Sequence, residues 1–587
     1  MCYDKSVSSK IGKNTRTIWL LLLLVLIGFA LAVRFYLLGE IPVGTYWDET
    51  AMLADARFVA NLGRDINNNH WFQAIFFSYG DYKLPIYIWL ASVSVRFFGN
   101  NPWALRLPSA LTGLMTLGVV VLIAKQLFSK HVHESSRQKW LFCWLLPIAV
   151  SPWAIMFART GFEGHLGQLF LAVSVWLVLK AAASRRFKLT LLLAAQLAAA
   201  IATYTYFSVR FVWPIVFLTQ MVLANWPEAG LKAVKPLSSR HFLRQLLEII
   251  KFAVFKLLLP LGLFLLLLAP MTNSPFYQDS NRFRFNTTSV LNMNNWALES
   301  NILREKTGNT VISRLFYHRY VLIGRELLRN FSDNLSLNYL FVNGDPNLRH
   351  GTGEHGLFLL PFLPILLLGL YRLWMEHKRE FILLNVWWLA AVLPASVPDD
   401  TPHALRSLNA LVPVSLILGF TVFSLVKQGF KQGQTAKKLA GAVWAGWLLF
   451  STAQFTHFYF NVYPVQSAPE WQAGYRTMAE DACQAKDDYS QIWIDHGDDK
   501  FFLWVLAYCQ FDRPLSELYQ YKDDYRHQLL NLYFDHYQLS DLDPNGDGVL
   551  FITRSQDLNK QQTQPAAKIV KPIPKEIYHY FIGGKRP

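Results

Sequence analysis

The chain alternates long apolar segments with short polar ones. The first apolar segment, residues 17–38 (TIWLLLLLVLIGFALAVRFYLL), can cross about 30 Å of hydrocarbon at about 1.5 Å per residue. Further apolar segments follow it, so we interpret it as an anchor and not as a removed signal peptide. Length and apolarity predict further spans near residues 104–125, 139–153, 165–182, 186–203, 205–224, 251–270, 356–373, 380–397, 407–427 and 437–457. The pattern predicts an all-α polytopic membrane protein with about 11 transmembrane helices.

Composition and charge support this interpretation. Of 587 residues, 52% are hydrophobic and only 16% are charged, which excludes an ordinary soluble protein. The net charge of +16 does not indicate nucleic acid, because much of the excess lies in short loops between apolar segments. The basic N-terminus predicts a cytoplasmic start, so the first span ends outside.

Three segments are predicted to lie outside the membrane on that same face: an outer loop over 39–103, a long outer loop over 272–354 and a tail over 458–587. Within the first loop, residues 82–99 (YKLPIYIWLASVSVRFFG) are apolar enough to span, but a span there would place the Lys-rich loops outside. We therefore predict a juxtamembrane aromatic helix at the outer interface, although the sequence leaves open whether 83–98 spans.

The tail is predicted to form a small extracytoplasmic α/β domain, separate from a membrane domain over 1–457. Its segments QIWIDHG and GVLFITRS have the pattern of short buried strands, and KFFLWVLAYCQ that of a helix or a strand. Four cysteines in so long a chain exclude a disulfide framework. Cys483 and Cys509 both lie in this tail, where one disulfide between them is compatible with an outside location.

Candidate chemistry gathers in the outer loops, where an acidic pair, Asp48 and Glu49, follows the first span. Carboxylates among cations, at the depth of lipid phosphates, suit attack by an acceptor hydroxyl on a sugar whose leaving group is a lipid phosphate. One carboxylate would accept the hydroxyl proton, and Lys or Arg would stabilise the departing phosphate. No Walker loop appears, as expected for a lipid-linked donor. The outer loops over 39–103 and 272–354 contain no DxD-type donor motif, so we predict no metal ligands and no cofactor, while leaving a divalent metal open.

Each candidate also has a plainer interpretation. Asp48 could be a helix N-cap, and Arg96 and Arg106 interfacial anchors. Arg159 and Glu163 have the i, i+4 spacing of a simple helix salt bridge. His165 is more typical of a packing histidine, and His403 with Arg406 could simply mark a helix that enters the membrane.

The order of several motifs resembles a known family. Asp48-Glu49 is followed by GRD at 63–65, GDYKLPIYIWL at 80–90, FGNNPWALRLPSALTG at 98–113 and ARTGFEGHLG at 158–167. Together these resemble bacterial members of glycosyltransferase family 39 and the aminoarabinose lipid A transferases, GT-C class enzymes related to protein O-mannosyltransferases. The segments FVNGDPNLRHGTGEHGLF at 341–358 and DDTPHALRSLNALVPV at 399–414 are similar to those of further bacterial members, and the resemblance covers roughly residues 15–425.

The resemblance implies a polyprenyl-phosphate sugar donor, such as an undecaprenyl-phosphate sugar, with inverting transfer to a lipid, glycan or protein acceptor. It also implies a bacterial cytoplasmic membrane and a cavity that faces the periplasm. Asp48 matches the catalytic acidic residue, and Glu49 would support or orient it. Lys83 resembles a lysine that contacts the carrier phosphate, although Leu84 here separates it from the proline that directly follows that lysine in the lipid A transferases. Predicted contacts to donor phosphate or sugar are Lys83, Arg159, Glu163, Arg210, His403 and Arg406.

A function of another class remains as an alternative, namely a transporter or flippase of lipid-linked sugars. Transport predicts ionisable groups near the middle of the membrane and repeated, discontinuous helices. The ionisable groups of this chain instead cluster at one predicted surface, which favours the transferase.

Overall fold

The computed structural model describes residues 5–78, 81–128, 137–184, 186, 188–225, 252–428, 435–495, 500–509, 519–522, 526–529, 532–534, 549–553, 568–573 and 576–583. They form two compact units, which are described separately. The helical unit comprises Met1–Phe35, Leu111–Ala158 and Glu163–Thr456, and the mixed unit comprises Tyr36–Ala110, Arg159–Phe162 and His457–Pro587. The predicted cytoplasmic loop at 226–251 lies outside the described residues.

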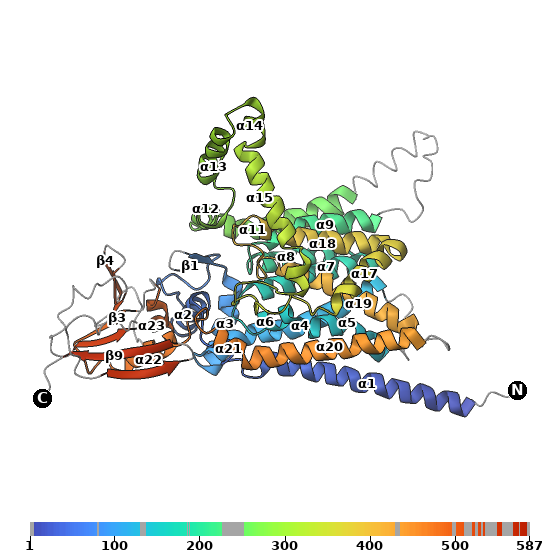
Figure 1. Ribbon diagram of the computed structural model, residues 1–587, viewed down its shortest axis with the longest axis horizontal. Coiled ribbons are helices and arrows are strands. Elements are labelled where there is room, and N and C mark those ends of the chain that lie inside the picture. The colour runs from blue at the N-terminus through green and yellow to red at the C-terminus, as the bar shows by residue number, and fades with distance from the viewer. Residues whose placement is uncertain are drawn as a thin grey trace. The chain divides into compact units, whose positions relative to one another are not determined.

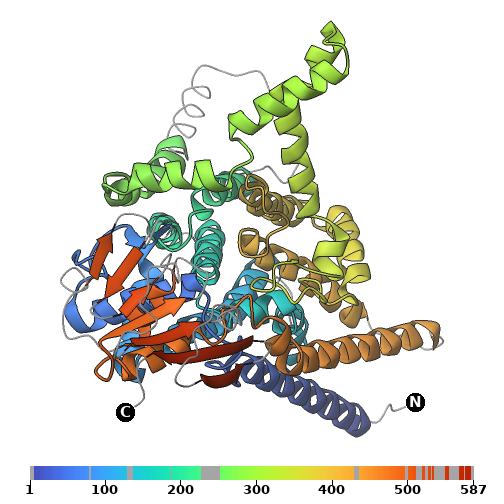
Figure 2. The same ribbon diagram turned by 60° about the vertical axis from the view of Figure 1, so that its left-hand side comes forward.

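The helical unit is built almost entirely from α-helices (Figures 1 and 2). Two long helices, α4 (Pro102–Phe128) and α20 (Thr435–Asn461), belong mostly to this unit, while the first turns of α4 and the last turn of α20 belong to the mixed one. The other elements of the unit are α1 (Lys5–Phe35), α5 (Arg137–Ala149), α6 (Pro152–Phe157), α7 (Gly164–Ala183), α8 (Lys188–Thr203), α9 (Val209–Asn225), η2 (Phe252–Leu258), α11 (Leu259–Thr272), α12 (Tyr277–Thr288), α13 (Met293–Lys306), α14 (Val311–Phe316), α15 (Arg319–Asp333), α16 (Leu337–Phe341), α17 (Phe362–Glu376), α18 (Lys378–Val392), η3 (Leu393–Ser396), η4 (Leu408–Ala410) and α19 (Leu411–Gln428).

Helix α19 is central to the helical unit, whereas α11 lies at its periphery. Both are apolar around their whole circumference, but 78% of the apolar window at Leu408–Gln428 is buried against 17% of the window at Val254–Thr272. An apolar helix with so little protein around it requires a lipid environment. In α19, Gly419 permits close approach to α5, because a Cβ there would lie 2.8 Å from the Trp144 ring.

Five helical segments of the described residues are long and apolar enough to cross a membrane: Arg16–Phe35, Pro102–Phe128, Gly164–Ala183, Val254–Thr272 and Leu408–Gln428. These agree with predicted spans, and the polytopic all-α class is confirmed. The total of about 11 stays a prediction. Helix α3 (Pro85–Phe98) has 14 residues, and at about 1.5 Å per residue it reaches only about 21 Å, which is short for a span.

The segment predicted as a long outer loop, 272–354, contains helices α12 to α16. Figures 1 and 2 show α13, α14 and α15 projecting from the other helices of this unit. Side-chain caps begin three of the five helices, since Thr310 accepts from the Ser313 N–H, His318 from the Tyr320 N–H and Ser336 from the Tyr339 N–H.

The mixed unit combines helices with a seven-stranded sheet. Its helices are α2 (Trp47–Leu62), α3, the first turns of α4, α21 (Tyr463–Gln466), α22 (Tyr475–Gln484) and α23 (Phe502–Tyr508). A small hairpin joins β1 (Phe76–Ser78) to β2 (Asp81–Lys83). The large sheet has the order β4-β5-β6-β3-β7-β9-β8, in which β3 is parallel to β6 and β7 and the remaining pairs are antiparallel. Its strands are β3 (Gln491–Asp495), β4 (Tyr519–Lys522), β5 (Arg526–Leu529), β6 (Leu532–Phe534), β7 (Val549–Thr553), β8 (Lys568–Ile573) and β9 (Glu576–Gly583).

Several predictions for the tail are confirmed in this unit. Strands β3 and β7 occupy the two segments predicted as strands and pair with each other in parallel. The segment that could have been a helix or a strand contains helix α23, which Figure 1 shows beside α22 and β3. Cys483 and Cys509 form the disulfide, which links α22 to the end of α23.

Candidate active site

Asp48 and Lys83 meet in the mixed unit, from positions 35 residues apart in sequence. Asp48 lies in the first turn of α2, and Lys83 ends β2, where the Phe76–Lys83 register of the hairpin fixes its position. The Lys83 ammonium donates to Asp48 Oδ1 and lies 2.8 Å from Asp81 Oδ2. The Lys83 side chain is 7% exposed and that of Asp48 is 32% exposed. The ammonium is therefore buried, whereas the carboxylate that it contacts is accessible to solvent.

Asp48 is not the helix N-cap. Tyr46 occupies that position with an extended backbone, and its side chain makes no capping hydrogen bond. Asp48 and Glu49 are both in the first turn, where negative charge is stabilised by the helix dipole. Adjacent residues of a helix point in directions about 100° apart, so the two carboxylates cannot act as one pair.

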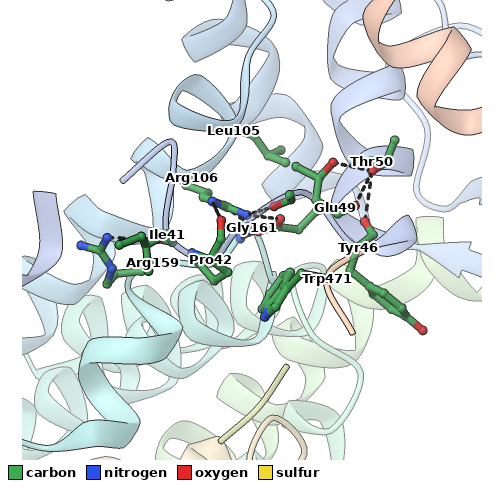
Figure 3. Close-up of polar contacts among 12 residues, drawn as sticks. Ile41, Pro42, Tyr46, Glu49, Thr50, Leu105, Arg106, Arg159, Gly161 and Trp471 are labelled. Atoms are coloured by element: carbon green, nitrogen blue, oxygen red, sulfur yellow. Dashed lines mark hydrogen bonds and ion pairs between the residues drawn. The ribbon is translucent and has the colours of Figure 1, made fainter. Parts of the chain in front are cut away.

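Glu49 binds Arg106 in the interior of the mixed unit (Figure 3). The Arg106 Nε donates to Glu49 Oε1 at 3.1 Å and its Nη2 to Oε2 at 2.8 Å, and neither side chain is exposed to solvent. Glu49 Oε1 also accepts the Gly161 N–H. Because both carboxylate oxygens are engaged within the protein, Glu49 is suited to orient its surroundings and not to accept a substrate proton.

Arg106 is not the interfacial anchor that its sequence position suggests. Its guanidinium is fully buried and donates to three backbone carbonyls, Leu38 at 3.3 Å, Pro42 at 2.9 Å and Gly44 at 2.6 Å. It also lies 5.8 Å from the centre of the Trp471 ring. Arg106 therefore binds the backbone of the segment between α1 and α2 at three points, and Figure 3 shows its contact with Pro42.

Arg159 has a similar position in the mixed unit. Its Nη2 donates to the carbonyls of Leu37 and Ile41 at 3.1 and 3.0 Å, and its guanidinium lies 4.9 Å from the Phe460 ring centre. Residues 158–163 lie outside α6 and α7, so Arg159 and Glu163 do not have the i, i+4 geometry of a pair within one helix. These contacts give Arg159 a structural position beside the Glu49–Arg106 pair.

Asp55 lies two helical turns after Asp48 on α2 and is fully buried. Its Oδ1 accepts the Ile66 N–H at 3.2 Å. Burial raises the pKa of Asp55 well above its ordinary value, and the negative charge of Asp65 adds to the effect, while the Ile66 N–H and Lys83 oppose it. Asp55 therefore favours its protonated form behind the site.

Residues from the tail hold the start of α2. The Trp47 N–H donates to Gln472 Oε1 at 3.0 Å, and the Thr45 and Tyr508 hydroxyls are 3.2 Å apart. The Lys500 ammonium lies 3.9 Å from the centre of the Trp47 ring. The tail carries no recognisable motif, so these neighbours of Asp48 could not be identified from sequence.

The remaining predicted residues belong to the helical unit. Glu163 occupies the N-cap position of α7 with helical backbone angles. Arg210, in the first turn of α9, donates to the Phe207 carbonyl at 3.1 Å, and Arg406 donates to the Asp400 carbonyl at 2.9 Å. His165 is buried and its Nδ1 lies 3.0 Å from the Phe157 carbonyl oxygen, which confirms the interpretation as a packing residue.

His403 is buried in a polar cluster with Asp345 and His350, a grouping that their positions in the sequence do not indicate. Burial lowers the pKa of both imidazoles well below the ordinary value, and the charges of Arg349 and Arg406 act in the same direction. Burial raises the pKa of Asp345 to about 7, against the opposing effect of hydrogen bonds from the Ala404 and Asn347 N–H groups.

The comparisons with known proteins agree with this architecture. Residues 83–237 match the family model described as dolichyl-phosphate-mannose-protein mannosyltransferase, and no curated protein matches the chain. The crystal structure of ArnT from Cupriavidus metallidurans bound to undecaprenyl phosphate is similar over 95% of this chain and 97% of that chain, with 12% identity and a TM-score of 0.51. The apo form of that protein gives 14% identity and a TM-score of 0.50 over the same shares. An oligosaccharyltransferase from Archaeoglobus fulgidus, tethered to an acceptor peptide, is more distant, with 13% identity, 84% and 63% coverage and a TM-score of 0.45.

The match to ArnT extends over nearly the whole of both chains, and the apolar helices are of the length that membrane spans require. The chain is therefore a multi-pass membrane protein with the fold of the GT-C class of membrane glycosyltransferases.

Proposed function

We propose that the protein is an integral membrane glycosyltransferase that transfers a sugar, with inversion, from a polyprenyl-phosphate donor to an acceptor hydroxyl. The contact between Asp48 and Lys83 carries the proposal, because it places a carboxylate and an ammonium together at the start of α2. The undecaprenyl phosphate bound to ArnT supports a donor of the polyprenyl-phosphate class.

In the proposed reaction the acceptor oxygen attacks the anomeric carbon as the bond from that carbon to the phosphate oxygen breaks. The hydroxyl proton passes to Asp48, and polyprenyl phosphate leaves with the bonding electron pair. Lys83, which contacts Asp48 and Asp81 in the structure described, would turn its ammonium to the leaving phosphate. That movement would also free Asp48 from its cation, which makes the carboxylate a better proton acceptor.

The other predicted residues have supporting or donor-binding roles in the proposed mechanism. Glu49 orients the turn through Arg106, and Arg159 holds the bend before α2. Arg210 and Arg406 are proposed to contact the phosphate or sugar of the donor, and Glu163 stays a predicted donor contact. We further propose a bacterial cytoplasmic membrane, with Asp48 facing the periplasm. The acceptor class, whether lipid, glycan or protein, is left to the assay.

The test is transfer by purified protein supplied with radiolabelled polyprenyl-phosphate sugars and candidate acceptors. Asp48→Asn should lose transfer while still binding the carrier lipid, and Lys83→Ala should weaken use of the donor. Asp81→Asn is the matched control. The Asp81 side chain also contacts Lys83 and is 30% exposed, but the proposed reaction does not use it as a proton acceptor. Near-native turnover in Asp48→Asn would remove the proposed base, and translocation of the labelled lipid without product would favour a flippase.

A further inference from the structure

Asp345, His350 and His403 bring three metal-ligating side chains together in the helical unit. One ligand atom from each lies within 4.8 Å of the other two, and all three residues are buried. Asp345 and His350 come from the segment between α16 and α17, and His403 from the segment between η3 and η4. The cluster therefore joins two segments that are more than fifty residues apart in sequence.

The carboxylate of Asp345 is held in a fixed orientation. Its Oδ1 accepts the Asn347 N–H at 2.9 Å and its Oδ2 accepts the Ala404 N–H at 2.7 Å. Each carboxylate oxygen has a second lone pair, so both bonds leave capacity to bind a cation. Backbone donors of this kind are what fixes a carboxylate ligand around a metal.

The spacing of the three side chains also fits a shared ion. His350 Nδ1 is 3.8 Å from Asp345 Oδ2, too far for a hydrogen bond. Ligands around a tetrahedral zinc ion, with bonds of about 2.0–2.1 Å, lie about 3.3 Å apart, so a movement of about half an ångström would bring this pair into place. The two imidazole rings are already close, with centroids 4.3 Å apart and an angle of 33° between their planes.

Both positively and negatively charged side chains surround the cluster. Arg349 and Arg406 oppose a cation, since their charges act on both imidazoles. Asp400 favours it, because its Oδ2 lies 3.9 Å from His403 Nε2. One carboxylate and two neutral imidazoles leave a divalent ion with a single net positive charge, which Asp400 can offset. Two nitrogens and one oxygen are a ligand set that suits zinc better than magnesium or calcium.

We propose that Asp345, His350 and His403 bind one divalent transition-metal ion of the zinc type. The ion pins the segment after α16 to the segment before η4, and a water molecule can complete its coordination. This site uses none of the residues assigned to proton transfer above, and it gives His403 the role of a metal ligand in place of the donor contact predicted from sequence.

Metal binding is tested on the full chain purified in detergent, stripped with a chelator and then dialysed against Zn²⁺ or Co²⁺. We expect one metal ion per chain and, with Co²⁺, the visible absorption of a tetrahedral site. Asp345→Asn, His350→Gln and His403→Gln should each weaken binding by more than about tenfold. His355→Gln is the matched control, because His355 is in the same segment and its Nδ1 lies 3.1 Å from the Thr352 hydroxyl and not in the cluster.

X-ray absorption at the zinc edge is measured on the unmutated protein, so the result does not depend on whether a variant folds. The expected first shell contains only nitrogen and oxygen, with the scattering of two imidazoles. A protein that takes up no stoichiometric metal, a shell that contains sulfur, or variants that keep the metal as well as His355→Gln does would each overturn the site. None of these measurements uses sugar transfer, so failure here is distinct from failure of the proposed function.

Discussion

Replacing Glu49 with glutamine tests whether this residue acts through structure or through chemistry. Glutamine keeps the shape of the side chain and its Oε1 can still accept the Gly161 N–H, but it removes the charge opposite Arg106. Both members of the pair are 0% exposed, and removal of one partner from a buried ion pair costs about 3–5 kcal/mol, because it leaves an unpaired charge in the interior.

The lower end of that range is expected for Glu49→Gln. Arg106 keeps its hydrogen bonds to the carbonyls of Leu38, Pro42 and Gly44, which disperse part of the uncompensated charge. We therefore expect a loss of about 3 kcal/mol, or roughly 150-fold in the folding equilibrium. Glu49→Ala, which also removes the acceptor of the Gly161 N–H, should lose more.

The measurement is unfolding of purified protein in mild detergent by titration with a denaturing detergent, followed by tryptophan fluorescence. Asp48→Asn is the control, because the Asp48 side chain is 32% exposed and should cost less than about 1 kcal/mol in stability. A double variant, Glu49→Leu with Arg106→Met, should cost less than the sum of the two single changes, since no unpaired charge remains. If Glu49→Gln unfolded like the unmutated protein while losing transfer, Glu49 would touch the reaction and the structural role would be refuted.

Three further predictions concern the mixed unit. Burial raises the pKa of Asp55, so its contribution to stability is greatest below the unfolded pKa of about 3.9 and falls as pH rises towards the folded pKa. Because asparagine does not ionise, the melting temperature of Asp55→Asn should rise relative to that of the unmutated protein as pH increases. A difference that stays flat as pH rises from the unfolded pKa of about 3.9 would contradict this. Cys483→Ser should lose about 2–4 kcal/mol, because the disulfide closes a loop with a sequence separation of 26 residues, and a reducing agent should produce the same loss in the unmutated protein only. Gly161→Ala should cost about 1–3 kcal/mol in the same unfolding titration, because the new Cβ would lie 3.2 Å from Glu49 Oε1, and unchanged stability would show that the loop gives way freely.

The membrane helices could be predicted from sequence because their signal is local. The segments Pro102–Phe128, Gly164–Ala183 and Leu408–Gln428, which contain α4, α7 and α19, are each at least 20 residues long and strongly apolar on average, and no tertiary contact is needed to recognise them. The long segment at 272–354 was harder, since its helices carry few apolar residues. The sequence predicted only an outer loop there, although Thr310 and Ser336 are of the residue types that favour helix N-caps.

The interior of the candidate site could be predicted only in part. Asp48, Glu49 and Lys83 lie in recognisable sequence motifs. The partner of Glu49, however, is 57 residues away in the sequence. That partner is an arginine near the start of an apolar helix, which has the pattern of an interfacial anchor. Nothing local distinguishes an anchor from a buried counter-ion. The motif segment FGNNPWALRLPSALTG did contain Arg106, so the signal was the motif and not the residue type.

The tail illustrates a stricter limit. Gln472 contributes an amide oxygen, Tyr508 a hydroxyl and Lys500 an ammonium near an aromatic ring, and such contacts leave no spacing rule in a sequence. They nevertheless act on the turn that carries Asp48, because an N–H in the first turn of a helix has no partner within the helix. Gln472 supplies that partner to Trp47, the residue directly before Asp48. The orientation of the proposed base therefore depends on residues more than four hundred positions away, and a tail that looks like an independent domain in sequence is part of the support of α2.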